Sequence, residues 1–463
     1  MIPERLRPML ADDSPLQELA RRFVAAGKSV YLVGGSVRDA LLGRTSPDYD
    51  LTTDAHPEEI ERLIAGWAEH VWLQGKAFGT IGCSRGDLRL EITTFRAEAY
   101  HPDSRKPNVT FADELEADLA RRDFTVNAMA LTLPEPVLVD PFGGIADLVA
   151  RRLRTPLDPE ISFLDDPLRM LRAARFIATL GLEPDPGLVP AVRDLRARLE
   201  IVSPERIRDE LSKLLVADDP SPGLWFLVET GLAEEFLPEL PALALEQDPV
   251  HQHKDVLAHT IAVVAKTRPE LTVRLAALLH DVGKPKTRSF GPEGVSFHLH
   301  DVVGARMAEE RLRALRFPKD TTLAVKELVA LHLRFHTYRM GWTDRAVRRY
   351  VRDAGPLLDD LNHLVRCDCT TRNQAKARAL ARRMDDLERR ITELEAEEEL
   401  RSIRPPLDGN RVMEILGVGP GRVVGEALSM LLDARLDEGP ISEEDAERRL
   451  RAWAAERGLR PTA

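Results

Sequence analysis

The sequence predicts a multidomain protein in which a compact α/β domain comes first and helical domains follow. The chain has 463 residues, enough for roughly three or four domains. Residues 28–147 alternate short β-rich runs with helical ones, which is the pattern of an α/β fold. From residue 148 onward the patterning is helical, and the sequence shows no convincing strand.

The composition indicates a globular protein of a reducing compartment. Charged residues make up 30% of the chain and hydrophobic residues 43%. No apolar run approaches the ~20 residues that span a bilayer, and residues 1–7 lack the apolar core of a signal peptide. Three cysteines, Cys83, Cys367 and Cys369, are too few for a disulfide framework. We therefore expect a cytoplasmic protein with no membrane partner.

The net charge of −11 is mild evidence against a nucleic-acid partner. Local basic clusters weaken that evidence, because a basic stripe on an acidic protein can still bind a phosphate backbone. The clusters lie at residues 121–122, 151–154, 345–352 and 376–390. Any one of them taken alone is best interpreted as a solvated helix face.

The α/β domain is expected to contain five short strands and one long loop. The strands are expected at residues 30–33, 49–52, 79–84, 88–95 and 137–140. Residues 96–114 are polar, contain proline and show no periodicity, so we expect a flexible loop there. Loops of that length are usually functional or disordered.

The helical region divides at a proline-rich stretch, residues 237–241. Helices are expected before it at residues 164–180, 204–215 and 224–229. A histidine-rich helical segment, a highly charged helix at residues 374–401 and a small helical unit come after it. We expect four domains, at residues 1–147, 148–245, 246–375 and 376–463.

The most informative stretch of the chain joins a glycine turn to a pair of carboxylates. Gly34 and Gly35 lie between an expected strand and an expected helix, where they allow a tight turn and close approach of a phosphate. Asp48 and Asp50 are two residues apart on the next strand, so their side chains share one face. Two such carboxylates suit Mg²⁺ bound to a nucleotide. The alternative is an ordinary strand–turn–helix followed by a solvated acidic turn, and the combination at this spacing favours the nucleotide site.

A second polar cluster lies in residues 121–130, which we expect to form an otherwise apolar helix. Asp123, Thr125 and Asn127 add hydrogen-bonding groups to it, and buried polar groups must be satisfied by protein or by ligand. In one interpretation Asp123 caps the helix. In the other, Arg122 contacts a phosphate and Asn127 or Asp123 lies near a ribose.

Three arginines recur every three residues on the expected helix 164–180. Arg169, Arg172 and Arg175 would form a basic ridge along one helix face. Asp166 and Arg169 can present an acceptor and a fork of donors side by side to the edge of a base. The competing interpretation makes Asp166 the N-cap of the helix, with proline at the first helical position. Three arginines in register beside an acidic pair favour ligand contact.

Together, residues 33–50, 121–130, 140–144 and 165–176 resemble the successive motifs of bacterial class II tRNA nucleotidyltransferases, the CCA-adding enzymes and their poly(A) polymerase relatives. The resemblance implies a small head with a mixed sheet like that of DNA polymerase β, followed by a helical neck, body and tail that hold tRNA. Residues 405–425 resemble the C-terminal part of the same enzymes.

The resemblance implies metal-dependent nucleotidyl transfer at the head. Asp48 and Asp50 would bind Mg²⁺, and Glu91 is a weaker candidate for a third acidic group. A tRNA 3′-hydroxyl would attack the α-phosphate of CTP or ATP, and pyrophosphate would leave, in a two-metal reaction. The flexible loop at residues 96–114 resembles one that enzymes adding only CC are thought to lack, so it favours addition of the terminal A as well.

The same resemblance implies that protein groups, rather than a nucleic-acid template, select the incoming base. The implied nucleotide-binding residues are Gly34, Gly35, Arg38, Arg122, Asp123, Asn127, Asp166, Arg169, Arg172 and Arg175. Asp166 and Arg169 would bond to the base itself. One departure is that Asp165 stands where the family usually has glutamate, which leaves its supporting hydrogen bonds open.

A histidine-rich pattern in the second half of the chain resembles the HD superfamily of metal-dependent phosphohydrolases. The implied ligands are His259, His280, Asp281 and Asp368, with His300 and His332 for a second metal ion. Imidazoles with carboxylates suit Mn, Ni, Fe or Zn ions. The alternative for any one histidine is a satisfied structural residue, but the His280–Asp281 doublet within this pattern favours metal.

These observations predict a CCA-adding tRNA nucleotidyltransferase that uses ATP, CTP and tRNA and carries an HD domain with a secondary phosphohydrolase activity. One alternative is an A-adding enzyme or poly(A) polymerase with the same catalytic residues. Another is an HD phosphohydrolase whose head is a vestigial RNA-binding module. The sequence leaves the oligomeric state open.

Overall fold

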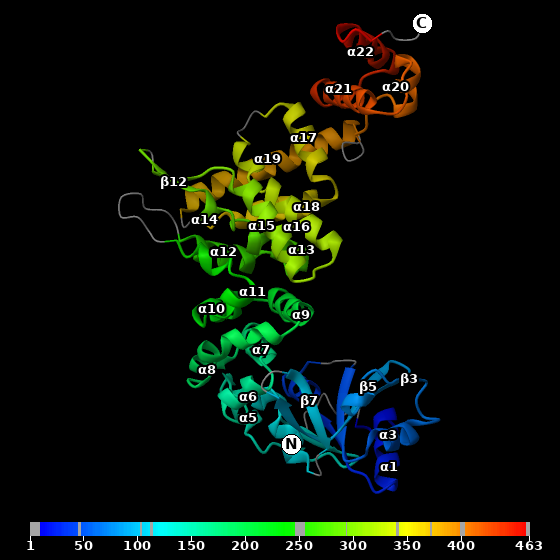
Figure 1. Cartoon of the computed structure of the whole chain (residues 1–463), viewed down its shortest axis with the longest axis vertical. Coiled ribbons are helices and arrows are strands. Elements are labelled where there is room, and N and C mark those ends of the chain that lie inside the picture. The colour runs from blue at the N-terminus through cyan, green and yellow to red at the C-terminus, as the bar shows by residue number, and fades with distance from the viewer. Residues whose placement is uncertain are drawn as a thin grey trace. The chain divides into compact units, whose positions relative to one another are not determined.

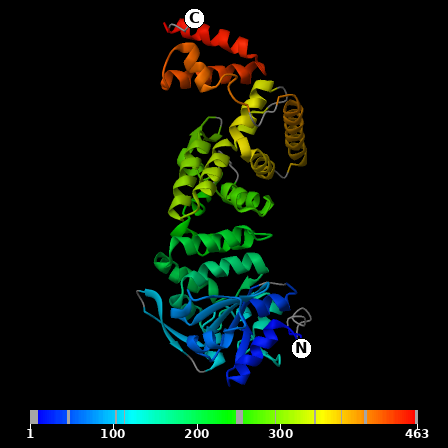
Figure 2. The ribbon, with the colours of Figure 1, turned by 90° about the vertical axis from the view of Figure 1, so that its right-hand side faces the viewer.

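The computed structural model divides into two compact units, Met1–Pro241 and Ala242–Ala463 (Figures 1 and 2). Each unit is described by itself. The structure describes residues 10–44, 48–101, 104–111, 114–245, 255–292, 294–338, 342–370, 373–398 and 403–459. No helix among these residues is long and apolar enough to cross a membrane.

The first unit begins with a head built on a mixed sheet, as predicted. Its strands have the order β3-β4-β5-β2-β1-β8-β9, and β2 and β5 are parallel while the other neighbours are antiparallel. In that order the bounds are His70–Trp72, Thr80–Arg85, Leu88–Thr94, Asp48–Thr53, Val30–Val33, Ala130–Leu133 and Leu138–Val139. All five expected strands are present; β3 and β8 were missed.

Apolar residues alternate along the central strands and pack against helices on the sheet, because successive side chains of a strand point to opposite faces. Leu32 of β1, Leu51 of β2 and Ile92 of β5 are fully buried with Phe23 of α1 and Ile60 of α3. The helical segments of the head are α1 Pro15–Ala25, α2 Gly35–Leu41, α3 Pro57–Ile64, η2 Lys76–Phe78, α4 Leu115–Ala120, η3 Thr125–Asn127 and α5 Gly144–Val149. This core fixes the strands that position the candidate site. Asp48 and Asp50 lie on β2, Glu91 lies on β5, and Gly34 directly follows β1.

Two expectations for the head were wrong. Residues 96–114 were expected to be a loop, but β6 Arg96–His101 and β7 Ser104–Phe111 form an antiparallel hairpin outside the main sheet. The sequence gave no strand signal there, because the segment is polar, contains proline and shows no periodicity. Residues 121–130 were expected to be a helix, but they form the short 3₁₀ turn η3 and lead into β8.

The rest of the first unit is a neck of helices. They are α6 Pro159–Asp165, α7 Leu168–Leu180, α8 Leu188–Leu195, α9 Pro204–Leu215, α10 Ser221–Glu229 and α11 Leu232–Phe236, with η4 Arg196–Ile201 and η5 Pro241–Leu243. The single helix expected at 164–180 is two helices, because Pro167 interrupts the hydrogen-bonding pattern. The expectation of no strand after residue 148 also fails, since β10 Arg152–Leu153 pairs with β11 Glu183–Pro184.

The second unit consists mainly of helices, as expected. Its body contains α12 Val256–Lys266, α13 Leu271–Leu279, α14 Lys284–Thr287, α15 His300–Ala314, α16 Lys319–Leu331, η6 Arg334–Thr337, α17 Asp344–Ala354, η7 Gly355–Leu357, α18 Leu358–Asp368 and α19 Gln374–Glu398. A hairpin of β12 Arg288–Gly291 and β13 Gly294–Phe297 is a further departure from the strand-free expectation. The tail helices α20 Gly409–Leu416, α21 Arg422–Glu438 and α22 Glu443–Glu456 share a separate apolar core.

Candidate functional site

Three acidic residues of the head line one hollow of about 350 Å³. Asp48 and Asp50 lie on β2, and Glu91 lies on the parallel neighbour β5, in register with Asp50. The two-residue spacing along β2 brings both aspartates to this hollow, as the sequence predicted. Glu91, the weaker candidate, is therefore beside them.

The electrostatics of the hollow favour a bound cation. Burial raises the pKa of Asp50, and the neighbouring charge of Asp48 raises it further, while Arg122 opposes the shift. Burial also raises the pKa of Glu91, as do the charges of Asp50 and Asp48. Carboxylates that repel one another in this way are stabilised in their charged form by a divalent ion with oxygen ligands. The donor set therefore fits a magnesium-like ion.

The glycine turn before α2 makes room for an arginine beside these carboxylates. Gly34 has a φ of +70°, a conformation that glycine adopts without strain. A Cβ atom there would lie 2.8 Å from Nη1 of Arg122 and 3.9 Å from Oδ2 of Asp50. The side chain of any other residue would therefore displace Arg122. Gly35 is the first residue of α2, and its Cβ position lies 3.5 Å from Arg38.

Asp118, which the sequence reasoning missed, fixes the arginine pair that follows α4. Its fully buried carboxylate accepts hydrogen bonds from Arg121 at 2.7 Å and from Arg122 at 3.3 Å. Burial by itself would raise the pKa of Asp118, but the two guanidinium groups hold that pKa below its ordinary value. The signal was present in the sequence, since Asp118 is three and four residues before the arginines on a helical segment.

A polar chain connects α2, η3 and α7. Arg38 donates to Oδ1 of Asn127, and Nδ2 of Asn127 donates to Asp123 at 2.9 Å. The same carboxylate accepts Nε of Arg172 at 2.7 Å. Asp123 is buried, yet Arg172 and Asn127 keep its pKa below the ordinary value against the effect of burial. The structure thus brings together four of the residues that the sequence selected.

Asp166 and Arg169 have partners within the protein. Asp166 lies just before α7, where one oxygen accepts the backbone N–H of Leu168 at 3.1 Å. Arg169 is buried, and it donates to the hydroxyl of Ser162 at 2.9 Å and to the carbonyl oxygen of Arg121. The three arginines of the expected basic ridge are therefore buried or half-buried: Arg169 and Arg172 reach groups of the head, and Arg175 pairs with Glu210 of α9.

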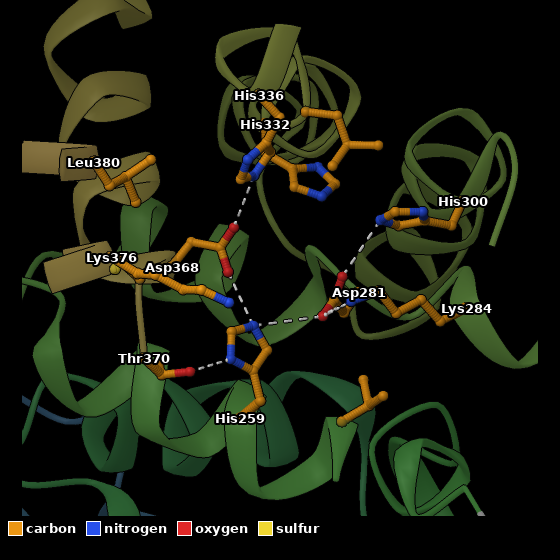
Figure 3. Close-up of a pocket in the computed structure, with 13 residues that line it drawn as sticks. His259, Asp281, Lys284, His300, His332, His336, Asp368, Thr370, Lys376 and Leu380 are labelled. Atoms are coloured by element: carbon orange, nitrogen blue, oxygen red, sulfur yellow. Dashed lines mark hydrogen bonds and ion pairs between the residues drawn. The ribbon is translucent and has the colours of Figure 1, made fainter. Parts of the chain in front are cut away.

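The histidine-rich pattern converges on one cavity of about 390 Å³ in the second unit (Figure 3). Five elements contribute: α12, the end of α13, the start of α15, the end of α16 and the end of α18. Two groups have ligand atoms that all lie within 4.8 Å of one another. One group is His259, His280 and Asp368, and the other is Asp281, His300 and His332. The geometry therefore pairs Asp281 with the two histidines expected at a second metal ion.

The ring nitrogens of this cluster are arranged as in metal sites. Nδ1 of His280, His300 and His332 each lies 2.6–2.7 Å from a backbone carbonyl oxygen, and Nδ1 of His259 lies 2.7 Å from the hydroxyl of Thr370. Such contacts orient the opposite nitrogen of each ring towards a metal ion. Nε2 of His280, His300 and His332 is buried and makes no hydrogen bond within the described part of the chain.

The protonation of His332 also fits metal binding. Burial, together with the neighbouring His280, lowers the pKa of His332 to about 4, so this ring is neutral at pH 7. A neutral imidazole is the form that binds metal ions. Nε2 of His259 lies 2.9 Å from Oδ1 of Asp368, and Nε2 of His300 lies 3.5 Å from Oδ1 of Asp281. Imidazole nitrogens and carboxylate oxygens therefore lie next to one another in the cavity.

Two further polar side chains of the cavity were not selected from the sequence. Lys284 contacts Asp281 at 2.6 Å, and His336, which is half exposed, lies 3.3 Å from Asp368 (Figure 3). Both offer positive or hydrogen-bonding groups to an anion next to the ligand set. Cys367 is buried, whereas the half-buried Cys369 lines the cavity.

Comparisons with known proteins match three successive parts of the chain. A family model described as poly A polymerase head domain matches residues 30–154, and one described as a probable RNA and SrmB-binding site of polymerase A matches residues 181–243. An HD domain model matches residues 256–394. An A-adding tRNA nucleotidyltransferase from Deinococcus radiodurans is 38% identical over 92% of this chain and 95% of its own. The chain belongs to the tRNA nucleotidyltransferase family.

Other members of the family match over different extents. A CC-adding tRNA nucleotidyltransferase from Thermus thermophilus is 34% identical over 92% of this chain and 94% of its own. A CCA-adding enzyme from Bacillus subtilis is 42% identical, over 46% of this chain and 53% of its own. The resemblance stated from the motifs is thereby confirmed, and the chain is a nucleotidyltransferase.

Solved structures share the fold of this tRNA nucleotidyltransferase. The CCA-adding enzyme of Bacillus stearothermophilus in complex with CTP superposes with a TM-score of 0.69, at 24% identity, over 96% of this chain and 98% of that one. The Thermotoga maritima CCA-adding enzyme complexed with tRNA gives a TM-score of 0.59 at 20% identity over 98% of both chains. The two domain types of this family, head and HD, generally bind divalent metal ions.

The histidine cluster predicts binding of two divalent ions. In calorimetric titration of the chelator-treated chain with NiCl₂, with excess MgCl₂ present to occupy the acidic hollow of the head, we expect two Ni²⁺ ions per wild-type chain. We expect at most one for His332→Ala, because that variant removes one ligand group. The exposed His298, outside the two groups, gives the control His298→Ala, which should keep two ions. No binding to the wild type, or two ions bound to His332→Ala, would contradict the assignment.

Proposed function

We propose that this chain adds CMP and AMP, from CTP and ATP, to the 3′ end of tRNA. The observation that carries the proposal is the proximity of three elements in the head. These are the acidic hollow of Asp48, Asp50 and Glu91, Arg122 beside it, and the chain of contacts from Arg38 to Arg172. The first suits metal ions, and the arginines suit a triphosphate.

Asp48 and Asp50 would hold Mg²⁺ in the head, with Glu91 next to them. When bound, the ions lower the barrier by activating the attacking hydroxyl oxygen and neutralising the leaving phosphate oxygens. Arg122 lies at the glycine turn, where its guanidinium group can bind the phosphates. Asp118 keeps Arg122 in this place through an ion pair of 3.3 Å. No nucleophilic side chain is needed, because the RNA supplies the attacking hydroxyl.

Selection of the base would depend on protein side chains that are held in place before the nucleotide binds. Asp123 orients Arg172 and Asn127, and Asn127 orients Arg38. Groups fixed in this way recognise a nucleotide without a template strand, because their donors are in place before it binds. Asp166 is the group we assign to the base edge. CTP, ATP and tRNA are cytoplasmic substrates, so we place the reaction in the cytoplasm.

The second candidate function is addition of the terminal A alone. It is favoured by the relative from Deinococcus radiodurans, which matches nearly the whole chain and is named A-adding. The relative from Thermus thermophilus, which matches as much of the chain, is named CC-adding. The hairpin β6–β7 occupies the segment that we associate with addition of A. The hairpin argues against addition of CC alone, and the two relatives differ in what they add. We therefore retain complete CCA addition as the main proposal.

For the HD region, we propose hydrolysis of phosphate esters with Mn, Ni, Fe or Zn ions. The two ligand groups and the adjacent Lys284 support this activity, since a lysine beside two metal ions attracts an anionic phosphate. We assign the four segments 1–147, 148–245, 246–375 and 376–463 to nucleotidyl transfer, neck, hydrolysis and tail. A vestigial head is less consistent with three carboxylates that share one hollow.

The products on two tRNA substrates distinguish the candidates. We expect the wild-type chain to extend both a tRNA that lacks CCA and a tRNA that ends in CC, each to CCA, as read by sequencing of the 3′ ends with CTP and ATP. Extension of the CC-ending tRNA alone would show an A-adding enzyme. Long A-tails, or CC without A, would contradict the main proposal.

Asp50→Asn tests the metal-binding role of the acidic hollow. The substitution keeps the size of the side chain but removes the charge, so we expect kcat for nucleotide addition to fall by a factor on the order of 10³. Asp87→Asn, on the exposed turn between β4 and β5, is the matched control and should keep wild-type kcat. Metal binding by the histidine cluster should be unchanged in both variants. Retention of more than about a tenth of the wild-type rate by Asp50→Asn would refute the assigned role.

A further inference from the structure

A tryptophan at one edge of the head sheet lies on the same face as the carboxylates of the acidic hollow. Trp72 belongs to β3, the first strand in the sheet order (Figure 1). It is in register with Gly82 of β4, which is in register with Glu91 of β5. Glu91 is in turn in register with Asp50 of β2. Residues in register across a sheet point to the same face. Trp72 therefore lines the hollow of about 350 Å³ together with both carboxylates.

Gly82 makes room for the indole ring of Trp72. A Cβ atom on Gly82 would overlap Nε1 and Cε2 of that ring, so a side chain there would push the indole away from the sheet. The ring thus lies over β4, the strand between β3 and the strand of Glu91. Trp72 is half-buried, and it lies on the face opposite Ile81 and Ile92, which belong to the apolar core. Packing of that core therefore does not explain its position.

Arg89 adds a cation to the same face. It lies two residues before Glu91 on β5, so both side chains line the hollow, and it is in register with Asp48. The Arg89 side chain is exposed and makes no ion pair within the described part of the chain. An indole ring and an unpaired guanidinium group in one hollow suit single-stranded nucleic acid, because a base stacks on the ring and a phosphate pairs with the cation.

The position of these two residues relative to the carboxylates favours the RNA over the incoming nucleotide. In the sheet order, β2 lies between β1 and β5. Arg122, which we assign to the triphosphate, lies beside Gly34 at the end of β1, whereas Trp72 and Arg89 lie on the β5 side. In a two-metal displacement the attacking and leaving oxygens are in line on opposite sides of the phosphorus. With the triphosphate on the β1 side, the attacking RNA hydroxyl approaches from the β5 side.

We propose that Trp72 and Arg89 bind the unpaired 3′ end of the RNA substrate. A base of that end stacks on the indole ring of Trp72, and a phosphate of the same strand pairs with Arg89. The two contacts hold the 3′-hydroxyl beside the carboxylates of the hollow. The inference rests on the proposed function, because it requires that the hollow receives an RNA end.

The dissociation constants of two tRNAs, measured by fluorescence anisotropy with MgCl₂ and without nucleotide, test the role of Trp72. Trp72→Leu keeps an apolar side chain over Gly82 but removes the aromatic plane. We expect it to weaken binding of a CC-ending tRNA by on the order of tenfold, while a tRNA trimmed to its paired acceptor stem binds as it does to the wild type. Trp72→Phe, which keeps a ring for stacking, should recover most of the loss. The control is Val71→Ala, on the same strand in register with the buried Cys83, which should bind both tRNAs as the wild type does.

Arg89→Gln tests the phosphate contact through the salt dependence of the same binding. Each phosphate contact with a single strand contributes about 0.7 to the slope of log affinity against log salt concentration. We therefore expect the slope for the CC-ending tRNA to become shallower by about 0.7 in this variant. The control is Arg85→Gln, since Arg85 pairs with Glu18 of α1 at 2.8 Å, and its slope should equal that of the wild type.

The possible outcomes separate this proposal from the proposed function. Unchanged affinity of Trp72→Leu for the CC-ending tRNA, with or without a loss of thermal stability, would overturn the role of Trp72. Equal weakening of both tRNAs, or a raised KM for ATP and CTP instead, would also overturn it, and an unchanged slope for Arg89→Gln would overturn the role of Arg89. A wild-type chain that adds no nucleotide would refute the proposed function, while the two binding experiments need no turnover and would still decide both roles.

Discussion

The arrangement of the proposed nucleotide site depends on the ion pair between the buried Asp123 and the half-buried Arg172. Asp123 comes from the turn before β8, and Arg172 comes from α7, so the pair joins the sheet of the head to the first long helix of the neck. Removal of one partner of a buried pair typically costs about 3–5 kcal/mol, because the other charge stays buried without compensation. The same carboxylate holds Asn127, which in turn holds Arg38. One buried charge thus orders donors from three elements.

The two candidate metal sites present different donor atoms to a metal ion. In the head, carboxylates of adjacent parallel strands repel one another, and a hard cation with oxygen ligands relieves that repulsion. In the HD region, backbone carbonyl groups take one nitrogen of each buried histidine and leave the other without a hydrogen bond in the described residues. The donor atoms of each region therefore suit a divalent ion.

The sequence predicted the parts of the site whose geometry follows from local periodicity. Two-residue spacing on a strand was sufficient to bring Asp48 and Asp50 to one hollow. The candidate metal cluster was predicted in another way, from the resemblance of the histidine and aspartate pattern to the HD superfamily. Local pattern could not show that residues 125–127 form a 3₁₀ turn, because Asn127 and Asp123 bond to Arg38 and Arg172, which lie far away in the sequence. Spacing alone also could not show which groups accept the hydrogen bonds of Arg169.

For the same reason, the sequence could not predict contacts between residues that lie far apart in the chain. Glu210 lies 35 residues after Arg175 and has no motif of its own, so only the packing of α9 on α7 shows their ion pair. The segment that forms the β6–β7 hairpin is polar, contains proline and shows no periodicity, and therefore gave no strand signal. Full-length relatives confirm the family.

The dissociation constants of CTP and ATP for Asp123→Asn, compared with the wild type, test the central claim most directly. The variant keeps the shape of the side chain but removes the charge that holds Arg172. If this buried charge orders the pocket, both constants rise by roughly tenfold or more while metal binding by the histidine cluster stays unchanged. Wild-type affinity for both nucleotides in a folded Asp123→Asn chain would contradict the claim.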